Sequence, residues 1–245
     1  MNYHVCIKQV PDVATLPDSG RLVLNAYDAS ALEAALTLRE LHGGAVQVVL
    51  VGPGSAKDVI LRALGMGADS AVHLLVNDER CYSQMDSHAF AEILCGYFQA
   101  ATWDVILCGK QAQDTDAGLT GSMLAEMLSV PCTTNAIQLE RDGERIVATR
   151  QGDTGQARII LPTPCLVTCS NDMNDPRIPT LKGTMAARTK PIEVRILTSL
   201  PESRTAIVAS AAMPGRRRGE LIAGPTREER VRTLVDRLYN EAKVL

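Results

Sequence analysis

The order of apolar and amphipathic segments is the feature that most constrains this fold. From the N-terminus to about residue 130, short apolar runs alternate with longer segments whose apolar residues recur at helical spacing. The apolar runs cover residues 3–8, 45–52, 71–76 and 104–109. The helical segments cover residues 28–44, 55–68, 86–101 and 117–128. Such alternation predicts an α/β fold, a parallel twisted sheet with helices on both faces.

Polar residues and glycines mark the expected ends of these helices. The candidate N-caps are Asp28 or Ser30, then Ser55, then Asp86 or Ser87. The candidate stop signals are Gly43, Gly44, Gly65 and Gly67. These residues define where each helix of the alternating series is expected to begin and end.

Composition agrees with a helix-covered sheet and excludes several classes of function. Hydrophobic residues make up 46% of the chain but aromatic ones only 3%, so the core must consist of Ala, Val, Leu and Ile. The net charge of −3 gives no electrostatic footprint for nucleic acid. No apolar run approaches the roughly 20 residues of a membrane span, and the opening residues lack the features of a signal peptide. We therefore expect a cytoplasmic protein.

Cysteine and histidine patterns do not point to a metal site. The seven cysteines lack C-x-x-C spacing, and an odd number cannot all pair. Several lie in apolar runs, where a free cysteine acts as a small hydrophobic residue. The four histidines show no ligand spacing with each other or with any cysteine. A reduced setting without a bound metal is the expectation.

The pattern changes after Pro131. A D-G turn at Asp142 and Gly143 lies between two β-rich runs and predicts an antiparallel β-hairpin, followed by another buried strand. From about Asn171 the chain is rich in Pro, Thr and basic residues and is expected to form a long arm. We expect an α/β nucleotide-binding domain at 1–170, including the hairpin, and a recognition loop and C-terminal arm at 171–245.

The arm is expected to end in a helix. Thr226 and Glu229 form a capping box. Five apolar residues then fall on one face of the helix: Val231, Leu234, Val235, Leu238 and Ala242. A single apolar stripe must pack against something, either this chain or another.

Polar and glycine-rich segments follow three of the predicted strands: "CIKQVPD", "VGPGS" and "CGKQAQDTDAGLTG". In a parallel α/β sheet, ligands lie beyond the carboxyl ends of the strands, where helix N-termini offer free N–H groups. In the third segment, Lys110 can pair with a phosphate, Thr115 and Thr120 offer hydroxyls, and Asp114 or Asp116 can accept from ribose or an adenine amine. Gly109, Gly118 and Gly121 permit close backbone approach.

This signal is limited in what it specifies. It matches neither a P-loop nor a G-x-G-x-x-G fingerprint, and the same residues also suit an ordinary turn and helix cap. The residues alone therefore indicate a protein of the α/β class that binds an adenine nucleotide, and they do not determine its chemistry.

Several motifs, in order, resemble the β subunit of electron-transfer flavoproteins over nearly the whole chain. They are "CIKQVPD", "LNAYDASALEAALTLRE", "ALGMGAD", "CGKQAQDTDAGLTGSMLAEML", "LPTPCLVT" and "NDPRIPTLKGTMAARTKPIEV". The resemblance implies an adenine-nucleotide α-hydrolase-like fold and a heterodimer with an α subunit that holds most of a redox-active FAD. It implies an electron carrier with no catalytic residue of its own, and a nucleotide in this subunit: AMP, or a second FAD in electron-bifurcating members.

Family positions carry over to this chain residue by residue. The implied cofactor-binding residues are Cys6, Asn25, Ala26, Tyr27, Asp28, Val51, Gly109, Lys110, Gln111, Ala112, Gln113, Asp114, Thr115, Asp116, Ala117, Gly118, Leu119 and Thr120. Cys6 and Val51 would act through backbone groups. Tyr27 either touches the α-subunit flavin or is a core tyrosine. Gly118-Leu119 departs from the family pattern, which has a polar side chain there.

The same resemblance implies partners. Leu181 matches the anchoring leucine of the family's recognition loop, which docks on a flavin dehydrogenase such as an acyl-CoA dehydrogenase; the alternative is packing within this chain or against the α subunit. Acceptors of the family include a quinone oxidoreductase and ferredoxin. The basic run Arg216–Arg218 is expected to be solvated or to face the other subunit.

Two other functions fit the fold class less well. A stand-alone ATP- or AMP-binding regulator of the universal-stress type would be a homodimer and would leave the arm without a role. An ATP pyrophosphatase would need a Ser-Gly-Gly phosphate loop where this chain has "KQVPD". The identity of the nucleotide stays open; "CIKQVPD" looks closer to microbial members and slightly favours FAD over AMP.

Overall fold

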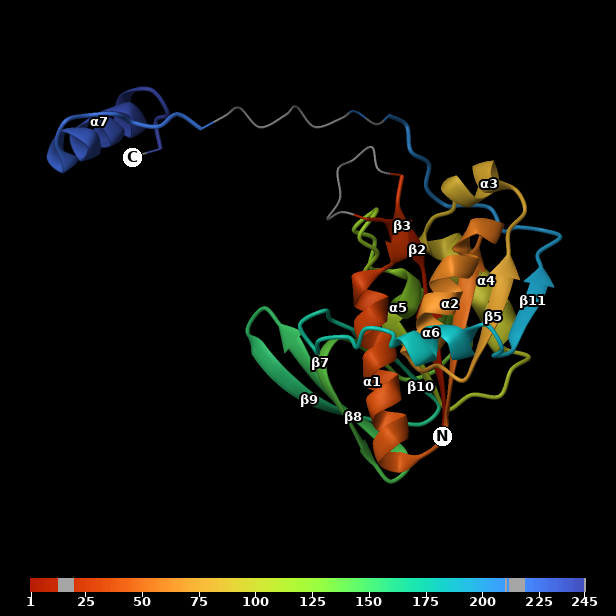
Figure 1. Cartoon of the computed structure of the whole chain (residues 1–245). Coiled ribbons are helices and arrows are strands. Elements are labelled where there is room, and N and C mark those ends of the chain that lie inside the picture. The colour runs from red at the N-terminus through yellow and green to blue at the C-terminus, as the bar shows by residue number, and fades with distance from the viewer. Residues whose placement is uncertain (13–19, 210, 212–218, 245) are drawn as a thin grey trace. The chain divides into compact units, whose positions relative to one another are not determined.

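A computed structural model describes residues 1–12, 20–209, 211 and 219–244 (Figure 1). The chain divides into two compact units, Met1–Ala206 and Ile207–Leu245. The first unit is built on a nine-stranded sheet in the order β11-β5-β4-β1-β6-β10-β7-β8-β9. Residues 171–206, which were expected to belong with the C-terminal arm, are part of the first unit.

Parallel pairing joins the strands of the central sheet. In sheet order, the parallel strands are β11 (Ile192–Ile196), β5 (Ser70–Leu75), β4 (Ala45–Gly52), β1 (Asn2–Ile7), β6 (Val105–Gly109), β10 (Cys165–Cys169) and β7 (Cys132–Asp142). The predicted apolar runs thus form adjacent strands. Their carboxyl ends meet at one edge of the sheet because all of them run in the same direction.

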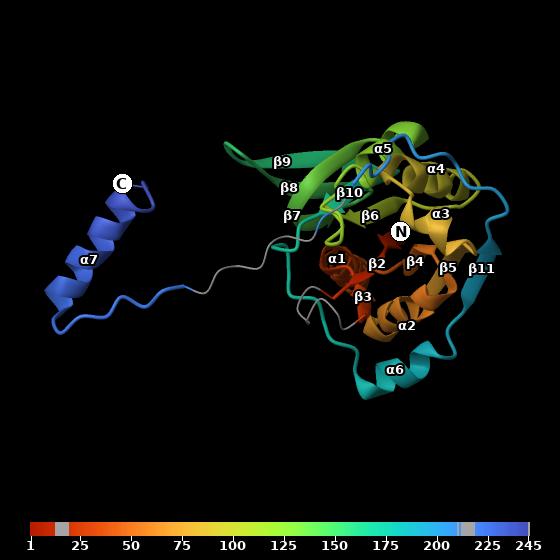
Figure 2. The same ribbon diagram turned by 90° about the horizontal axis from the view of Figure 1, so that it is seen from above.

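Helices cover both faces of this sheet (Figure 2). α1 (Ala26–His42) and α2 (Lys57–Met66) contribute to one hydrophobic cluster, with the odd-numbered side chains of β1. α4 (Ser87–Phe98) and α5 (Thr120–Leu128) contribute to a second cluster, with Cys6 of the same strand. Successive residues of a strand point to opposite faces, so one apolar run serves two clusters. The predicted fold class is confirmed.

The expected helix ends are partly right. Asp86 caps α4 by accepting from Ala89 N, and Gly67 follows the last residue of α2, as predicted. α1, however, begins at Ala26 after Asn25, so Asp28 lies inside its first turn rather than at its cap. Ser55 lies in a short 3₁₀ helix, Gly54–Ala56, that precedes α2. The predicted cap at Asp28 is wrong because Asn25 and Asp28 form hydrogen bonds with residues that are distant in sequence, as described below.

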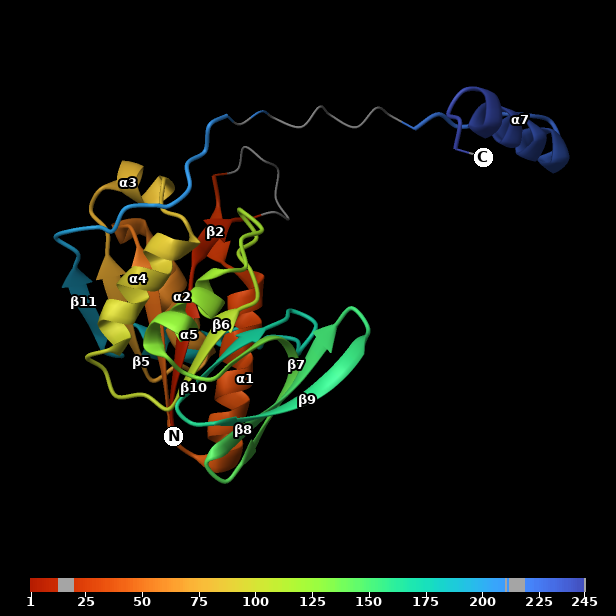
Figure 3. The same cartoon turned by 180° about the vertical axis from the view of Figure 1, so that it is seen from behind.

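Antiparallel strands extend one edge of the sheet (Figure 3). β7 pairs with β8 (Arg145–Gly152) across a turn at Gly143, whose φ of 60° suits glycine, so the predicted hairpin is confirmed. A third antiparallel strand, β9 (Gly155–Pro162), was not predicted. Nor were β2 (Gln9–Pro11), β3 (Leu22–Leu24) and the short helix α3 (Glu79–Ser83). β2, β3 and α3 are too short to give a clear periodic pattern, and β9 is exposed along most of its length.

The segment after Asn171 lies on the first unit rather than apart from it. α6 (Leu181–Ala187) packs against α2, and Ala187 is buried. The contact is close because Gly183 lacks a side chain: a Cβ there would lie 2.5 Å from Gly65 O. β11 then adds a parallel strand beside β5. Short side chains and backbone pairing, rather than bulky apolar residues, hold this segment in place.

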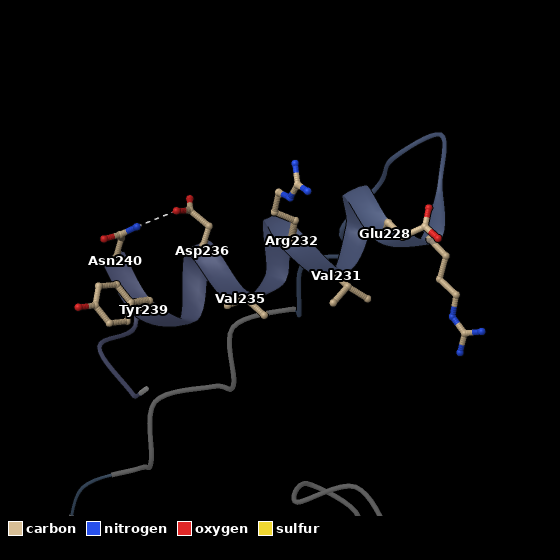
Figure 4. Close-up of a pocket in the computed structure, with 8 residues that line it drawn as sticks. Glu228, Val231, Arg232, Val235, Asp236, Tyr239 and Asn240 are labelled. Atoms are coloured by element: carbon tan, nitrogen blue, oxygen red, sulfur yellow. Dashed lines mark hydrogen bonds between the residues drawn. The ribbon is translucent and has the colours of Figure 1, made fainter.

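The second unit contains α7 (Arg227–Asn240). Thr226 accepts a hydrogen bond from Glu229 N at 3.2 Å, which confirms this half of the predicted capping box. Val231, Val235 and Tyr239 line one side of α7 (Figure 4), and each is about half exposed or more. Ala242 falls beyond the helix end, so the stripe is shorter than predicted. Arg216–Arg218 lie outside the described residues.

A membrane-spanning helix is not found among the described residues, since none of their helices combines the required length with sufficient apolar character.

Candidate functional site

The predicted binding segments converge at the carboxyl edge of the central strands. β1 and β6 are neighbours, with Cys6 beside Cys108 in register, and β4 flanks β1 on the other side. The loop 110–119 leaves this edge after β6 and ends at α5. Its first residue is fixed by a hydrogen bond from Lys110 N to Cys169 O of β10 at 2.7 Å. Segments as distant in sequence as Cys6 and Cys108 therefore share one rim.

Asp28 ties the ends of two strands to the first turn of α1. Its Oδ2 accepts from Lys8 N at 2.8 Å, and its Oδ1 accepts from Gly109 N at 3.0 Å. Burial raises the pKa of Asp28 to about 7, although hydrogen bonds from Asn25, Lys8 and Gly109 act in the opposite direction. The carboxyl group of Asp28 thus has a structural task at the rim.

Asn25 holds the loop 110–119 against the start of α1. Its Nδ2 donates to Gln111 O at 2.9 Å, and its Oδ1 accepts from Gln113 N at 3.2 Å. Gln113 reciprocates, because its Oε1 accepts from Ala26 N at 3.0 Å. These polar groups, predicted as cofactor contacts, are engaged with each other and shape the loop.

Lys8 supplies a paired cation at the rim. Its Nζ lies 3.0 Å from Oδ1 and 2.7 Å from Oδ2 of Asp114, and 5.4 Å from the centre of the Phe90 ring. The role predicted for Lys110, pairing with a phosphate of the ligand, is a separate one and stays a prediction. Within the described residues, Lys8 rather than Lys110 forms the ion pair here. The position of Lys8 directly after the first predicted strand is the sequence feature that could have identified it as a residue of this edge.

The rest of the loop is exposed and is shaped by its own backbone. Ala112 N donates to Ala117 O at 3.0 Å, and Gln111 Nε2 donates to Asp116 Oδ1 at 3.1 Å. Asp116 has a φ of 52°, a left-handed conformation that aspartate tolerates. The residues Asp114–Leu119 are exposed, so the side chain of Thr115 lies at the protein surface. Thr120 then begins α5.

The glycines of this loop approach the chain itself closely. A Cβ at Gly118 would lie 2.9 Å from Lys110 O, and one at Gly121 would lie 2.6 Å from Thr168 Cγ2. A Cβ at Gly109 would lie 2.2 Å from Asp28 Oδ1 and 2.7 Å from Tyr27 Cβ. Glycine is therefore required at these positions for the loop and its neighbours to pack.

Cys6 and Val51 are buried beneath the rim. A hydrogen bond with Cys6, together with burial, raises the pKa of the Cys108 thiol well above its usual value. A thiol in that state is a poor nucleophile at neutral pH. The side chains of Cys6 and Val51 are enclosed by the core, and their contact with a ligand through backbone groups stays a prediction. Tyr27 is half-buried at the same rim.

Two aromatic residues at this edge escaped the sequence analysis. Tyr82 of α3 and Phe90 of α4 pack edge to face, with ring centres 5.7 Å apart. A Cβ at Gly52, the last residue of β4, would lie 3.7 Å from the Tyr82 hydroxyl. α3 is too short to be recognised by periodicity, so nothing in the local sequence placed Tyr82 at the strand ends.

The chemistry that this edge offers is binding. It presents backbone amides, hydroxyls, a paired lysine and aromatic rings, which suit a nucleotide. A cluster of three or more His, Cys, Asp or Glu side chains able to hold a metal ion is not found in the described parts of the chain. Leu181 lies on α6, outside this loop, and is 81% exposed among the described residues.

Comparison with known proteins gives the family. The family described as "Electron transfer flavoprotein domain" matches residues 13–200. The chain is 35% identical to the "Electron transfer flavoprotein subunit beta" of Thermoanaerobacterium thermosaccharolyticum, covering 97% of this chain and 98% of that protein. It is 34% identical to the protein of the same name from Bacillus subtilis, covering 93% and 90%.

A third relative has a different name. The "Caffeyl-CoA reductase-Etf complex subunit CarD" of Acetobacterium woodii is 32% identical, with 97% of this chain and 98% of that protein covered. These matches extend over nearly the full length of both chains and include the strands, the loop 110–119 and the arm. The resemblance inferred from the motifs is confirmed: this chain belongs to the electron-transfer flavoprotein family, among its β subunits.

Proposed function

We propose that this chain is the β subunit of a heterodimeric electron-transfer flavoprotein, and that it holds an adenine nucleotide at the carboxyl edge of β1, β4 and β6. The observation that carries the proposal is the loop 110–119, which Asn25 and Asp28 fix over the strand ends. Backbone amides and hydroxyls on a rigid loop suit the ribose and phosphates of a nucleotide. Electrons would pass through the FAD of the heterodimer, most of which the α subunit holds.

The bound nucleotide is either AMP or a second FAD. The relatives named as a caffeyl-CoA reductase-Etf complex subunit and as an acryloyl-CoA reductase electron transfer subunit belong to reductase systems. Together with the opening motif, these names favour FAD and an electron-bifurcating member. In this version, the aromatic pair of Tyr82 and Phe90 lies close to where a larger ligand would bind.

Docking to a flavin dehydrogenase, such as an acyl-CoA dehydrogenase, is assigned to Leu181. This residue begins α6, is 81% exposed and is flanked by the equally exposed Ile178 and by Met185. An exposed leucine between other apolar residues forms a compact binding hot spot. The apolar side of α7 is assigned to the α subunit, and the acceptor is a quinone oxidoreductase or ferredoxin. The cytoplasm is the proposed location.

The test is the nucleotide content of the complex purified with its α subunit. Acid release followed by chromatography gives the amounts of FAD and AMP per heterodimer. Two FAD without AMP support the second flavin, whereas one FAD with one AMP identify AMP as the ligand of this chain. A colourless protein that purifies alone, as the universal-stress type of regulator would, contradicts the proposal.

A Leu119→Asp variant sharpens this test, because Leu119 lies at the end of the loop 110–119 and its side chain is 58% exposed. The added carboxylate repels phosphates, so the variant should lose the nucleotide of this chain and keep the FAD held by the α subunit. Leu41→Asp, at an exposed leucine in the last turn of α1, is the control with the same chemical change and should keep both nucleotides.

A further inference from the structure

The hydroxyl oxygen of Tyr82 is buried and has no hydrogen-bond partner among the described residues. Leaving a buried hydroxyl unpaired is unfavourable, and an unpaired group in a folded protein requires an explanation. A phenylalanine at this position would make the same edge contact with Phe90 without that cost. The hydroxyl therefore calls for a partner that the chain alone does not supply.

Three other buried polar atoms share this condition in the described part of the chain: His4 Nδ1, His88 Nδ1 and Asn174 Oδ1. His4 lies in the middle of β1 and packs on Phe98, the ring centres being 5.6 Å apart. His88 has Glu92 3.7 Å away, and Asn174 lies on the arm and donates to Ser30 O. Of the four, Tyr82 on α3 and His88 in the first turn of α4 follow β5 at the carboxyl edge of the sheet, and His88 has the Glu92 carboxylate as a neighbour.

Contacts around Tyr82 connect it to the proposed nucleotide site. Its hydroxyl lies beside Gly52, where an added Cβ would be 3.7 Å from the oxygen, and this places the hydroxyl at the end of β4. Its ring packs on Phe90, over which the Lys8 ammonium lies, and Lys8 pairs with Asp114 of the loop. The hydroxyl thus faces the end of β4 and lies within a cluster that reaches the loop 110–119.

We propose that Tyr82 is a nucleotide-binding residue whose hydroxyl donates a hydrogen bond to an acceptor atom of the adenine nucleotide at this edge, an inference that rests on the proposed function. The nucleotide supplies the partner that the described residues do not provide. Tyr82 thereby adds a contact from α3 to those from the strand ends and the loop 110–119.

The protonation state of Tyr82 suits this role. Burial raises the pKa of Tyr82 to about 12, and the nearby carboxylate of Asp114 adds to the rise. The side chain therefore stays protonated at neutral pH and keeps its O–H as a donor. Adenine ring nitrogens, ribose oxygens and phosphate oxygens are all acceptors for such a group.

The test compares Tyr82→Phe with Tyr97→Phe in the heterodimer, using AMP as the probe after the bound nucleotide has been removed. Both changes delete one hydroxyl from a buried ring. Tyr97, a residue of α4, is the control because its hydroxyl already donates a hydrogen bond to Gln47 Oε1 of β4 at 2.8 Å. Isothermal titration gives the dissociation constant for AMP, and a melting curve of the nucleotide-free complex gives its stability.

For Tyr82→Phe, we expect AMP binding to weaken about 5- to 10-fold, while the melting temperature of the nucleotide-free complex is unchanged or higher. For Tyr97→Phe, we expect the opposite pattern: unchanged affinity and a lower melting temperature. A residue with only a structural role would not separate the two measurements in this way.

Two negative results would have different meanings, one for the inference about Tyr82 and one for the proposed function. If the wild-type complex binds AMP and Tyr82→Phe binds it equally well, the inference about Tyr82 is wrong and the proposed function stands. If the wild-type complex binds neither AMP nor FAD at this subunit, the proposed function is wrong, and the inference falls with it.

Discussion

Asp28 illustrates how a residue that looks like a helix cap or a ligand contact can instead hold a binding edge together. Two backbone amides, from the ends of β1 and β6, donate to its two carboxyl oxygens. Its place in α1 was visible in the sequence, but the amides that it accepts come from Lys8 and from Gly109, 81 residues away. The partner set of such a residue exists only in the folded chain.

Gly109→Ala should destabilise the protein strongly, by more than about 3 kcal/mol. The added Cβ would lie 2.2 Å from Asp28 Oδ1 and 2.9 Å from Asp28 N, so α1 or β6 would have to move. Gly96→Ala is the matched control: it lies in α4 with no atom within 4 Å of the added Cβ, and it should stabilise by about 0.5 to 1 kcal/mol. Chemical denaturation of both variants measures the difference, and equal effects would contradict the packing described for Gly109.

Asp28 should make the stability of the protein fall as pH rises from about 4 to about 7. Because its pKa is raised to about 7 in the fold, the folded state binds the proton more tightly than the unfolded state within this window. Its stabilising contribution is therefore complete near pH 4 and is lost as pH rises through 7, with a slope of at most about 1.4 kcal/mol per pH unit.

Asp28→Asn cannot ionise and should lack this slope. Urea denaturation of both proteins at several pH values gives the difference in unfolding free energy, in which the other titrating groups cancel. A difference that stays constant between pH 4 and pH 7 would show that Asp28 does not titrate in this range.

At the scale of elements, Arg177 forms ion pairs that join the segment after Asn171 to α1. The Arg177 guanidinium binds Glu33 through Nε and Nη2, at 2.8 Å for the shortest contacts, and Glu40 through Nη1 and Nη2. Its backbone N also donates to Glu33 Oε2 at 3.0 Å. Glu33 and Glu40 are seven residues apart and so lie on one face of α1. This clamp precedes Leu181 by only four residues.

Arg177→Met should loosen the arm without unfolding the sheet. We expect a loss of about 1 to 2 kcal/mol, because the half-buried Glu33 loses its partner while Glu40 is exposed. Hydrogen exchange should become faster in residues 174–187 and stay unchanged in β1 and β6. Arg188→Met, an exposed arginine of the same arm, is the control. Equal exchange in the two variants would argue against a clamp.

At the scale of the whole molecule, the chain consists of a sheet-based unit and a unit that contains α7. Within the second unit, none of the described residues of α7 is buried, although its apolar side carries Val231, Val235 and Tyr239. An amphipathic helix that buries nothing in its own unit gains little stability from within it. The proposed α subunit would supply the missing surface.

Deletion of residues 207–245 should leave the first unit folded and weaken assembly with the α subunit. Circular dichroism should show a melting transition of the first unit within about 3 °C of the full chain, a shift that corresponds to well under 1 kcal/mol, and co-purification should show the loss of the partner. Val235→Asp in the full chain should reproduce the loss of assembly, and Thr233→Asp, on the opposite face of α7, should not. A truncated chain that still binds the α subunit fully would remove α7 from the interface.

Local patterns were sufficient for the framework of the first unit. The runs at 45–52 and 104–109, the cap at Asp86 and the turn at Gly143 were predicted from residues that are close in sequence, because strands, caps and turns depend on near neighbours. The motif around Gly109 was also sufficient for the family. The third antiparallel strand and α3 were missed, since their exposed or short sequences have no clear period.

The sequence by itself therefore determined the alternation of strands and helices, the polar segments at the strand ends and the family. Only the tertiary structure decided that Asn25 and Asp28 support the loop, that Lys8 pairs with Asp114, and that Tyr82 reaches the end of β4. The reason is physical. Periodicity records which face of an element is buried, whereas hydrogen bonds and ion pairs depend on which distant strand ends become neighbours once the sheet has formed.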